Sequence, residues 1–344
     1  MLVTTKEMLL DAQANHYAVG AFNIESLEFV MAVLAAAEET KSPVIMQTTP
    51  GTVKYAGLDY FYGMVKAAAE RATVPVALHL DHGDGFDRCM QAMRTGYTSV
   101  MIDGSHETFE DNIALTAFVA RVGAAMGVPV EAELGKVGGK EDDGPAVEGE
   151  SPYTDPEEAR EFVERTGCTS LAIGVGTAHG VYTETPHIEQ SVVKAIRSVV
   201  DVPLVLHGTS GVPDDQVAEA IKNGICKVNY ATELRQAFMR GFMGYMAENP
   251  GASTQEAQQA RHAGDHRPRQ GPHDQPRLRQ QGVGERSSHT ALAPVVVPLR
   301  VQQPGPSRAC WTCGARSCPP ARTRAAGREE RAPRRHHRGH PLTI

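Results

Sequence analysis

The sequence lacks both a hydrophobic run long enough to cross a membrane and a recognisable export signal. A membrane-spanning helix needs about 20 consecutive apolar residues, and the 344-residue chain contains no run approaching that length. The opening residues MLVTTKEM show neither a basic start nor an apolar core with a small-residue cleavage site. We therefore expect a cytoplasmic protein with no membrane partner.

Cysteine is scarce, with six in the chain. Cys89, Cys168 and Cys226 lie far apart within periodic segments, so we predict small buried side chains and no disulfide framework. The remaining three have irregular spacing and no organised histidine pair beside them, which does not favour a second zinc site: Cys310, Cys313 and Cys318.

Lysine is absent from residues 251–344, where the charge balance also reverses. Residues 1–250 hold 18 Lys and Arg against 35 Asp and Glu, whereas residues 251–344 hold 16 Arg, no Lys and 6 acidic side chains. Such an Arg, Pro and Gly-rich segment buries too little apolar surface to offset the entropy of ordering it. We predict a folded domain at 1–250 and a disordered tail at 251–344. No fold or aromatic platform accompanies the arginines, so we expect no nucleic-acid partner.

The composition of the tail also bears on its origin. Arg rises from 9 in residues 1–250 to 16 beyond them, and the only Ile of the tail is Ile344. Out-of-frame reading of a GC-rich gene favours Arg, Pro, Gly and Ala codons, so we interpret the tail as frameshifted. A genuine basic appendage is the alternative. A frameshift would replace closing helices and expose apolar surface near Phe238 and Phe242.

Short apolar runs alternate with amphipathic stretches over the first 250 residues. Val, Ile and Leu dominate the runs, and Gly, Pro or charged residues bound them, which is typical of buried parallel strands. The predicted strands are 18–24, 43–48, 76–80, 99–103, 128–134, 171–175, 203–206 and 226–230. Helical patterns lie at 26–39, 111–126, 156–166, 188–199 and 214–223.

Eight strand–helix units in about 250 residues predict a (β/α)8 TIM barrel. The alternative is an open doubly wound sheet, which normally carries a Gly-rich phosphate-binding loop after its first strand. After Ile24 the chain reads ESLE, which offers no such loop. The sequence therefore favours the barrel.

Histidines and carboxylates gather at the predicted strand ends, where the active sites of barrels form. His82, His179 and His207 each precede a glycine at a strand exit. Three imidazoles that converge on one rim and leave a position open match a catalytic zinc site, although each alone could be an ordinary rim residue. Glu133 and Asp103 are candidates to orient these ligands or to hold the metal in a second position. A polar network without a metal role is the alternative for both.

A loop of small residues follows the predicted seventh strand, at Gly208-Thr209-Ser210-Gly211. Backbone N–H groups of such a loop, together with the N-terminus of the next helix, can converge on an anion. Phosphate usually binds at the loops after strands seven and eight of a barrel. We therefore predict an anion site at this loop and at the neighbouring segment Asn229–Thr232.

Five segments together resemble the class II ketose-bisphosphate aldolases: HLDHG at 79–83, EAELG with GGKEDD within 131–143, GTAHG at 176–180, LHGTSG at 206–211 and KVNYATEL at 227–234. The resemblance covers about residues 1–250. The segments at 224–227 and 229–232 are most similar to the members that cleave tagatose 1,6-bisphosphate, with the fructose 1,6-bisphosphate members next. The resemblance implies reversible cleavage to dihydroxyacetone phosphate and glyceraldehyde 3-phosphate.

The resemblance also implies roles for single residues. His82, His179 and His207 would bind a zinc ion that stabilises the enediolate as a Lewis acid. Asp81 would be the general acid/base at the C4 hydroxyl, and Glu141 would move the proton at C3. A monovalent cation (Na⁺ or K⁺) near the phosphate and a homodimer or homotetramer are also implied. The residues implied to cradle the triose and its phosphate are Gly180, Gly208, Thr209, Ser210, Asn229, Tyr230, Ala231 and Thr232.

Three other functions compete with this one. A Schiff-base aldolase needs a lysine inside the barrel, and Lys227 is the candidate because the predicted sixth strand has none. A barrel metallohydrolase typically carries His-x-His on its first strand, which holds no histidine here. A damaged, non-catalytic barrel remains an alternative, because no arginine after residue 250 can be matched to the one that binds the distal phosphate in the family.

Overall fold

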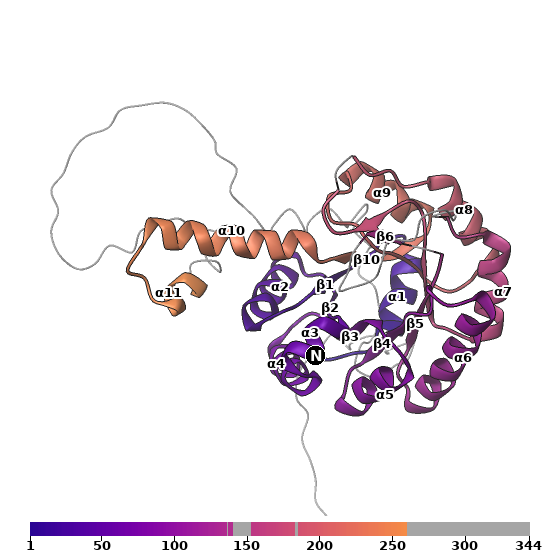
Figure 1. The fold of residues 1–344 in the computed structure, drawn as a ribbon, viewed down its shortest axis with the longest axis horizontal. Helices are drawn as coiled ribbons and strands as arrows, with labels where there is room; N and C mark the ends of the chain where they lie inside the picture. The colour runs from indigo at the N-terminus through magenta and orange to yellow at the C-terminus, as the bar shows by residue number, and fades with distance from the viewer. Residues whose placement is uncertain (136, 140–152, 183–184, 260–344) are drawn as a thin grey trace, which may run out of the picture. The chain divides into compact units, whose positions relative to one another are not determined.

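A computed structural model describes residues 1–135, 137–139, 153–182 and 185–259 of the chain. Eight parallel strands close into a barrel in the order β1-β10-β9-β7-β5-β4-β3-β2 (Figure 1). This confirms the predicted TIM barrel. The strands are β1 Val19–Asn23, β2 Val44–Thr48, β3 Val76–Gly83, β4 Ser99–Ile102, β5 Val130–Leu134, β7 Ser170–Ile173, β9 Leu204–Leu206 and β10 Ile225–Tyr230.

Helices follow the strands and cover the outside of the barrel (Figure 1). Asp155 caps helix α7 by accepting from the N–H groups of Glu157 and Glu158, and Pro156 occupies its first turn. The helices are α1 Thr5–Ala14, α2 Leu27–Thr40, α3 Pro50–Ala56, α4 Leu58–Arg71, α5 Phe86–Thr95, α6 Phe109–Met126, α7 Pro156–Thr166, α8 Gln190–Val199, α9 Asp214–Asn223 and α10 Thr232–Glu248. No helix in the described part of the chain is both long and apolar enough to cross a membrane.

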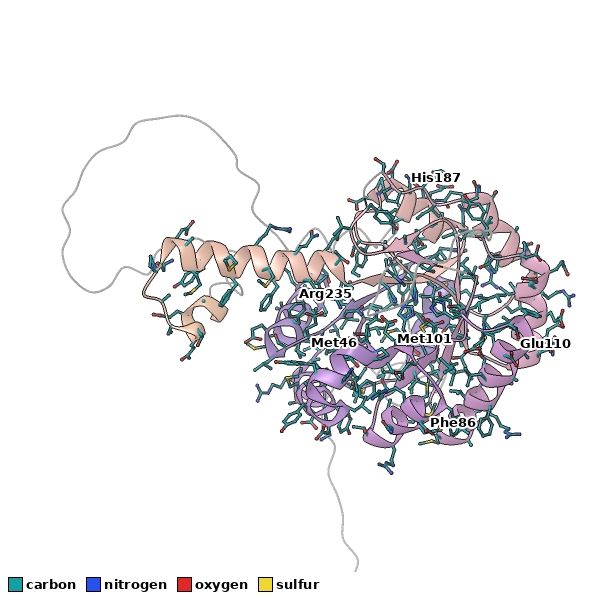
Figure 2. The ribbon with its side chains drawn as sticks, viewed as in Figure 1. Met46, Phe86, Met101, Glu110, His187 and Arg235 are labelled. Carbon is teal, nitrogen blue, oxygen red and sulfur yellow. The ribbon has the colours of Figure 1, made fainter. Side chains whose placement is uncertain are left out.

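The two faces of each strand bury different chemistry. On β3, Leu78 and Leu80 belong to the apolar layer between strands and helices, whereas His79 and Asp81 do not belong to it although both are fully buried. Because side chains alternate across a strand, His79 and Asp81 point into the barrel. Figure 2 shows how densely side chains fill the layers between the ribbons. The barrel therefore has an apolar outer layer and a partly polar interior.

Several elements were not predicted. Helix α1 precedes the barrel, and the Thr5 hydroxyl donates to Ser99 Oγ at 2.9 Å, at the first residue of β4. A small parallel sheet pairs β6 (Gly138–Gly139) with β8 (Ala178–His179). These two-residue strands are too short to leave a periodic pattern in the sequence.

The described chain continues past residue 250 as helix α11, Thr254–Gln259, where the sequence predicts no regular structure. Ser253 and Glu256 form a reciprocal cap at its start. The Ser253 N–H donates to Glu256 Oε2 at 2.8 Å, and the Glu256 N–H donates to Ser253 Oγ at 3.3 Å. The S-x-x-E pattern of a capping box was the available sequence signal. From residue 260 onward the predicted tail lies outside the described residues.

Helix α10 follows β10 and packs on α2. The ring of Phe238 stacks on Phe29 with centroids 4.9 Å apart. Arg235, near the start of α10 (Figure 2), forms an ion pair with Glu25. Leu27 and Met31 on α2, and Met239 and Met243 on α10, are about half exposed. Apolar side chains therefore remain at the surface on both of these helices.

Candidate active site

Three histidines from separate parts of the chain meet at one end of the barrel. His82 is the penultimate residue of β3, His179 lies in β8, and His207 directly follows β9. One ligand nitrogen from each lies within 4.8 Å of the other two. The ring centroids are 4.7 Å apart for His82 and His207 and 5.0 Å apart for His82 and His179. The structure thus brings together the three residues that the sequence singled out.

The end of β3 bends to place His82. The backbone of His82 has a φ of 48°, in the left-handed region that non-glycine residues rarely adopt. The pairing of β3 with β4 shifts register between Leu80 and Gly83. A bulge of this kind redirects a side chain, and backbone strain is often found at functional sites. His82 is therefore held in a conformation that a regular strand would not give it.

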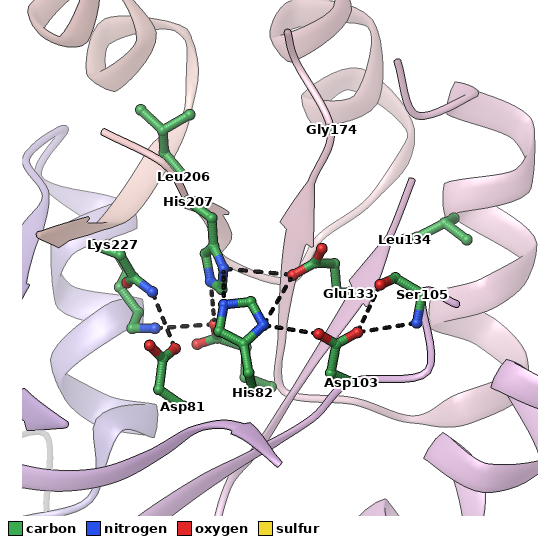
Figure 3. Close-up of polar contacts among 12 residues, drawn as sticks. Asp81, His82, Asp103, Ser105, Glu133, Leu134, Gly174, Leu206, His207 and Lys227 are labelled. Atoms are coloured by element: carbon green, nitrogen blue, oxygen red, sulfur yellow. Dashed lines mark hydrogen bonds and ion pairs between the residues drawn. The ribbon is translucent and has the colours of Figure 1, made fainter. Parts of the chain in front are cut away.

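Asp103 fixes the ring of His82. Its Oδ2 lies 2.8 Å from His82 Nδ1, while its Oδ1 accepts from the Ser105 N–H at 3.0 Å and hydroxyl at 2.7 Å (Figure 3). Burial opposes ionisation of Asp103, but the contacts with His82 and Ser105 outweigh it and hold the pKa of Asp103 below its usual value. Asp103 is thus an anionic acceptor, and this leaves His82 Nε2 to face the centre of the site.

His207 faces the same centre. Its Nδ1 lies 3.0 Å from His82 Nε2, so two imidazole nitrogens point at each other. Burial, reinforced by the neighbouring His82, lowers the pKa of His207 well below its usual value. A neutral imidazole is the form that binds a metal ion. Both nitrogens can therefore serve as ligands of one cation.

Glu133 supplies the test of whether a cation fits. Glu133 is 2% exposed, and its Oε2 has no hydrogen-bond partner in the described structure. That oxygen lies 3.4 Å from His207 Nδ1 and 3.9 Å from His82 Nδ1. Burial and the nearby Asp103 raise the pKa of Glu133 well above its usual value. A buried carboxylate oxygen without a donor beside nitrogen ligands fits a zinc or similar divalent ion.

Asp81 lies beside the histidines and accepts from three side-chain amides. Asn23 and Gln47 donate to Oδ2 at 3.1 and 3.0 Å, and Asn229 donates to Oδ1 at 3.1 Å. Asp81 is fully buried. Sequence reasoning missed Asn23 and Gln47, although a lone amide inside the otherwise apolar runs AVGAFNI and PVIMQT was a usable signal. The arrangement orients one carboxylate next to a possible metal ligand.

Comparison with known proteins agrees with this geometry. The model of the family "Fructose-bisphosphate aldolase class-II" matches residues 3–270. The chain belongs to the class II fructose-bisphosphate aldolase family. The match runs past residue 250, where the sequence predicts that the folded domain ends. It therefore includes α11 and the first residues that follow it.

Two solved structures of aldolases are similar to this chain. The YdjI aldolase from Escherichia coli K12 is 41% identical, over 76% of this chain and 91% of its own, with a TM-score of 0.67. The fructose-bisphosphate aldolase from Campylobacter jejuni is 26% identical, over 72% of this chain and 82% of its own, with a TM-score of 0.62. This chain is accordingly a class II aldolase, and members of this lyase family depend on zinc.

The predicted phosphate loop of this aldolase is packed tightly against the strand that carries His179. Gly208 has a φ of 63°, and a Cβ atom there would lie 2.6 Å from the carbonyl oxygen of Ala178. The Tyr182 hydroxyl accepts from the Ala178 N–H at 2.6 Å and donates to the Gly208 carbonyl at 2.7 Å. The loop and the strand that carries His179 are therefore packed together, and this packing leaves room only for glycine at position 208.

The loop also contacts the start of α10. Ser210 Oγ accepts from the Glu233 N–H at 3.3 Å, and Glu233 Oε1 accepts from the Gly211 N–H at 2.8 Å. Both N–H groups are thus occupied by protein atoms. Thr209 is 1% exposed, and Ser210 is also buried. The loop thus lies beside the N-terminus of α10, and the anion site stays a prediction.

The other residues that were predicted to bind substrate differ in their burial and in the direction of their side chains. Tyr230 stacks on Phe22 with centroids 5.8 Å apart in the outer apolar layer, so its hydroxyl points away from the barrel interior. Ala231 is buried at the N-cap of α10, while Gly180 and Thr232 are half-buried. Glu141, the predicted proton carrier at C3, lies outside the described residues.

Proposed function

We propose that this chain is a zinc-dependent aldolase that reversibly cleaves a ketose 1,6-bisphosphate to dihydroxyacetone phosphate and glyceraldehyde 3-phosphate, with tagatose 1,6-bisphosphate as the preferred substrate. The observation that carries the proposal is the meeting of three imidazoles with a carboxylate, Asp81, that three amides orient. Family membership supports the reaction class.

The residues divide into metal ligands and proton carriers. His82, His179 and His207 would hold the zinc ion, and Asp103 and Glu133 would orient these ligands or hold the metal in a second position. When bound, zinc supplies a Lewis acid that draws electron density from the ketose carbonyl. Asp81 takes the proton of the C4 hydroxyl while the C3–C4 bond breaks and its electron pair moves to C3. Glu141 then supplies the proton that C3 needs.

The substrate would be held by residues that neighbour the metal ligands in the sequence and in the fold. Gly180, the loop Gly208–Ser210 and the segment Asn229–Thr232 would bind the triose and its phosphate. Asn229 would also orient Asp81, because its amide donates to that carboxylate. The monovalent cation, the homodimer or homotetramer and the cytoplasmic location stay predictions.

The choice of tagatose over fructose rests on the segments 224–227 and 229–232. Ala231 offers no side-chain cap at the N-cap of α10, whereas many fructose-bisphosphate members carry a polar residue there. The test is kcat/KM of the purified full chain for both sugars, with a His207→Ala preparation as the control for contaminating host aldolase. A higher kcat/KM for fructose 1,6-bisphosphate would contradict the preference. No cleavage of either sugar would favour the damaged barrel.

A further inference from the structure

A column of polar side chains runs down the barrel interior beneath His207. Glu131 Oε1 lies 3.1 Å from His207 Nε2 and 3.0 Å from Lys227 Nζ. The other oxygen of Glu131 lies 3.8 Å from His79 Nε2, and His79 Nδ1 bonds Ser99 Oγ at 2.8 Å. Figure 3 shows His207, which directly follows β9, and Lys227, which lies on the neighbouring strand β10. None of these contacts serves the bond cleavage described above.

The two charges of this column are buried together. Lys227 is fully buried and Glu131 is 2% exposed. A buried ammonium or carboxylate is strongly destabilising without its partner, whereas removing both charges together can be nearly neutral. Lys227 thus needs its ion pair with Glu131 to remain buried and charged. This position explains why a lysine is tolerated in the interior without serving as a Schiff-base nucleophile or a phosphate ligand.

The contact with Glu131 also determines which nitrogen of His207 is available. Hydrogen positions follow from the hydrogen-bond partners. A carboxylate accepts only, so Nε2 of His207 must carry the hydrogen that faces Glu131. The lone pair then resides on Nδ1, the nitrogen that points toward His82 and Glu133. With the opposite tautomer, Nδ1 would present a hydrogen and could not bind a cation.

We propose that the Glu131–Lys227 pair is a positioning device for the metal site, in which Glu131 fixes the tautomer and ring orientation of His207 and Lys227 supplies the counter-charge. The proposal rests on the proposed function only in taking His207 as a metal ligand. Outer partners of metal-bound histidines typically contribute about 10–100-fold to metal affinity. The pair is therefore expected to affect zinc binding, although neither member belongs to the groups of candidate ligands.

Neutral replacements made singly and together test the pair. Glu131→Gln can keep one oxygen for both the His207 N–H and the Lys227 ammonium, because Oε1 of Glu131 contacts both, but it removes the negative charge that balances Lys227. Lys227→Met leaves the carboxylate of Glu131 without its counter-charge. The double variant removes both charges and keeps the amide oxygen for His207. The control is the double variant Lys66→Met with Glu70→Gln, which removes an exposed ion pair 2.9 Å apart on α4.

The readouts are the zinc Kd of the full chain, from competition with a chromophoric chelator, and the visible spectrum of the Co²⁺-loaded protein. Thermal unfolding of the chelator-treated protein is measured alongside. We expect each single variant to raise the zinc Kd about 10–100-fold and the double variant to recover most of that loss. The Lys66/Glu70 control should match the parent. A purely structural role would lower the unfolding temperature of the metal-free singles without changing the zinc Kd.

Parental zinc affinity in both single variants, or a double variant as weak as the singles, would overturn the proposal. If Lys227→Met does not fold, Lys227→Arg is measured in its place. A large loss of zinc affinity in Lys227→Arg, which keeps the positive charge, would also overturn the proposal. A different result would contradict the proposed function: zinc binding by His207→Ala as tight as that of the parent. Loss of zinc in His207→Ala together with unchanged single variants would reject the positioning pair alone.

Discussion

Asn229 on β10 donates its side-chain amide to Asp81 on β3, with 3.1 Å between Nδ2 and Oδ1, across 148 positions of sequence. Asp81 is also the acceptor for Asn23 on β1 and Gln47 on β2. Side chains from three other strands thus determine the position of one carboxylate beside His82. Such preorganisation is what a proton carrier requires, because its geometry must be set before the substrate arrives.

Replacement of Asp81 should separate catalysis from metal binding. We expect Asp81→Ala to lower kcat by about 10²–10⁴-fold, the usual contribution of a proton-transfer group, while zinc content stays near one ion per chain. His207→Ala should lose the metal. Asp84→Ala, at a position 54% exposed and paired with Arg88, is the control and should keep both activity and metal. Near-normal cleavage by Asp81→Ala would mean that its role is structural.

Gly208→Ala should damage the active site more than an equivalent change elsewhere. Gly127 has a similar φ of 70°, but an added Cβ there meets nothing within 4 Å, whereas at Gly208 it would lie 2.6 Å from the Ala178 carbonyl oxygen. Both changes cost about 1–2 kcal/mol of backbone strain. Displacing the loop by about 1 Å can cost about 10²-fold in rate. We therefore expect kcat/KM to fall strongly in Gly208→Ala and to stay near normal in Gly127→Ala; equal values would contradict the proposed role of the loop.

The three cysteines of the barrel should resist thiol reagents in the native protein. Cys89, Cys168 and Cys226 are buried and free, as the sequence predicted. Burial raises the pKa of Cys168 and of Cys226 to about 11 and that of Cys89 to about 12. Alkylation at pH 8 followed by peptide mapping should modify them only after unfolding. Rapid modification of any of the three in the native state would show that the barrel opens locally.

The origin of the tail can be tested on the gene. If residues from about 251 onward are frameshifted, another reading frame should encode a lysine-containing amphipathic ending. The reason is the change in composition, from 9 Lys in residues 1–250 to none in residues 251–344. Resequencing around codon 250 and translating all frames is the measurement. A gene without such an ending in any frame would support a genuine appendage.

The strands of the barrel could be predicted from the sequence because each is a continuous apolar run with polar boundaries. The predicted run 76–80 is the start of β3, and 226–230 lies within β10. The three histidines could be predicted as a group because parallel strands in a barrel bring their carboxyl ends together. The amides that donate to Asp81 and the contact of Glu131 with His207 could not be predicted. They depend on which residues of distant strands come into register, and sequence periodicity does not encode this.

The central claim is that this barrel cleaves a ketose bisphosphate with a metal ion and without a covalent lysine intermediate. The most direct measurement is cleavage by the full chain with and without a chelator, and with borohydride added together with substrate. We predict activity that the chelator abolishes, that zinc restores and that borohydride leaves unchanged, because Lys227 is buried against Glu131. Activity that survives thorough chelation but is lost with borohydride would contradict the account.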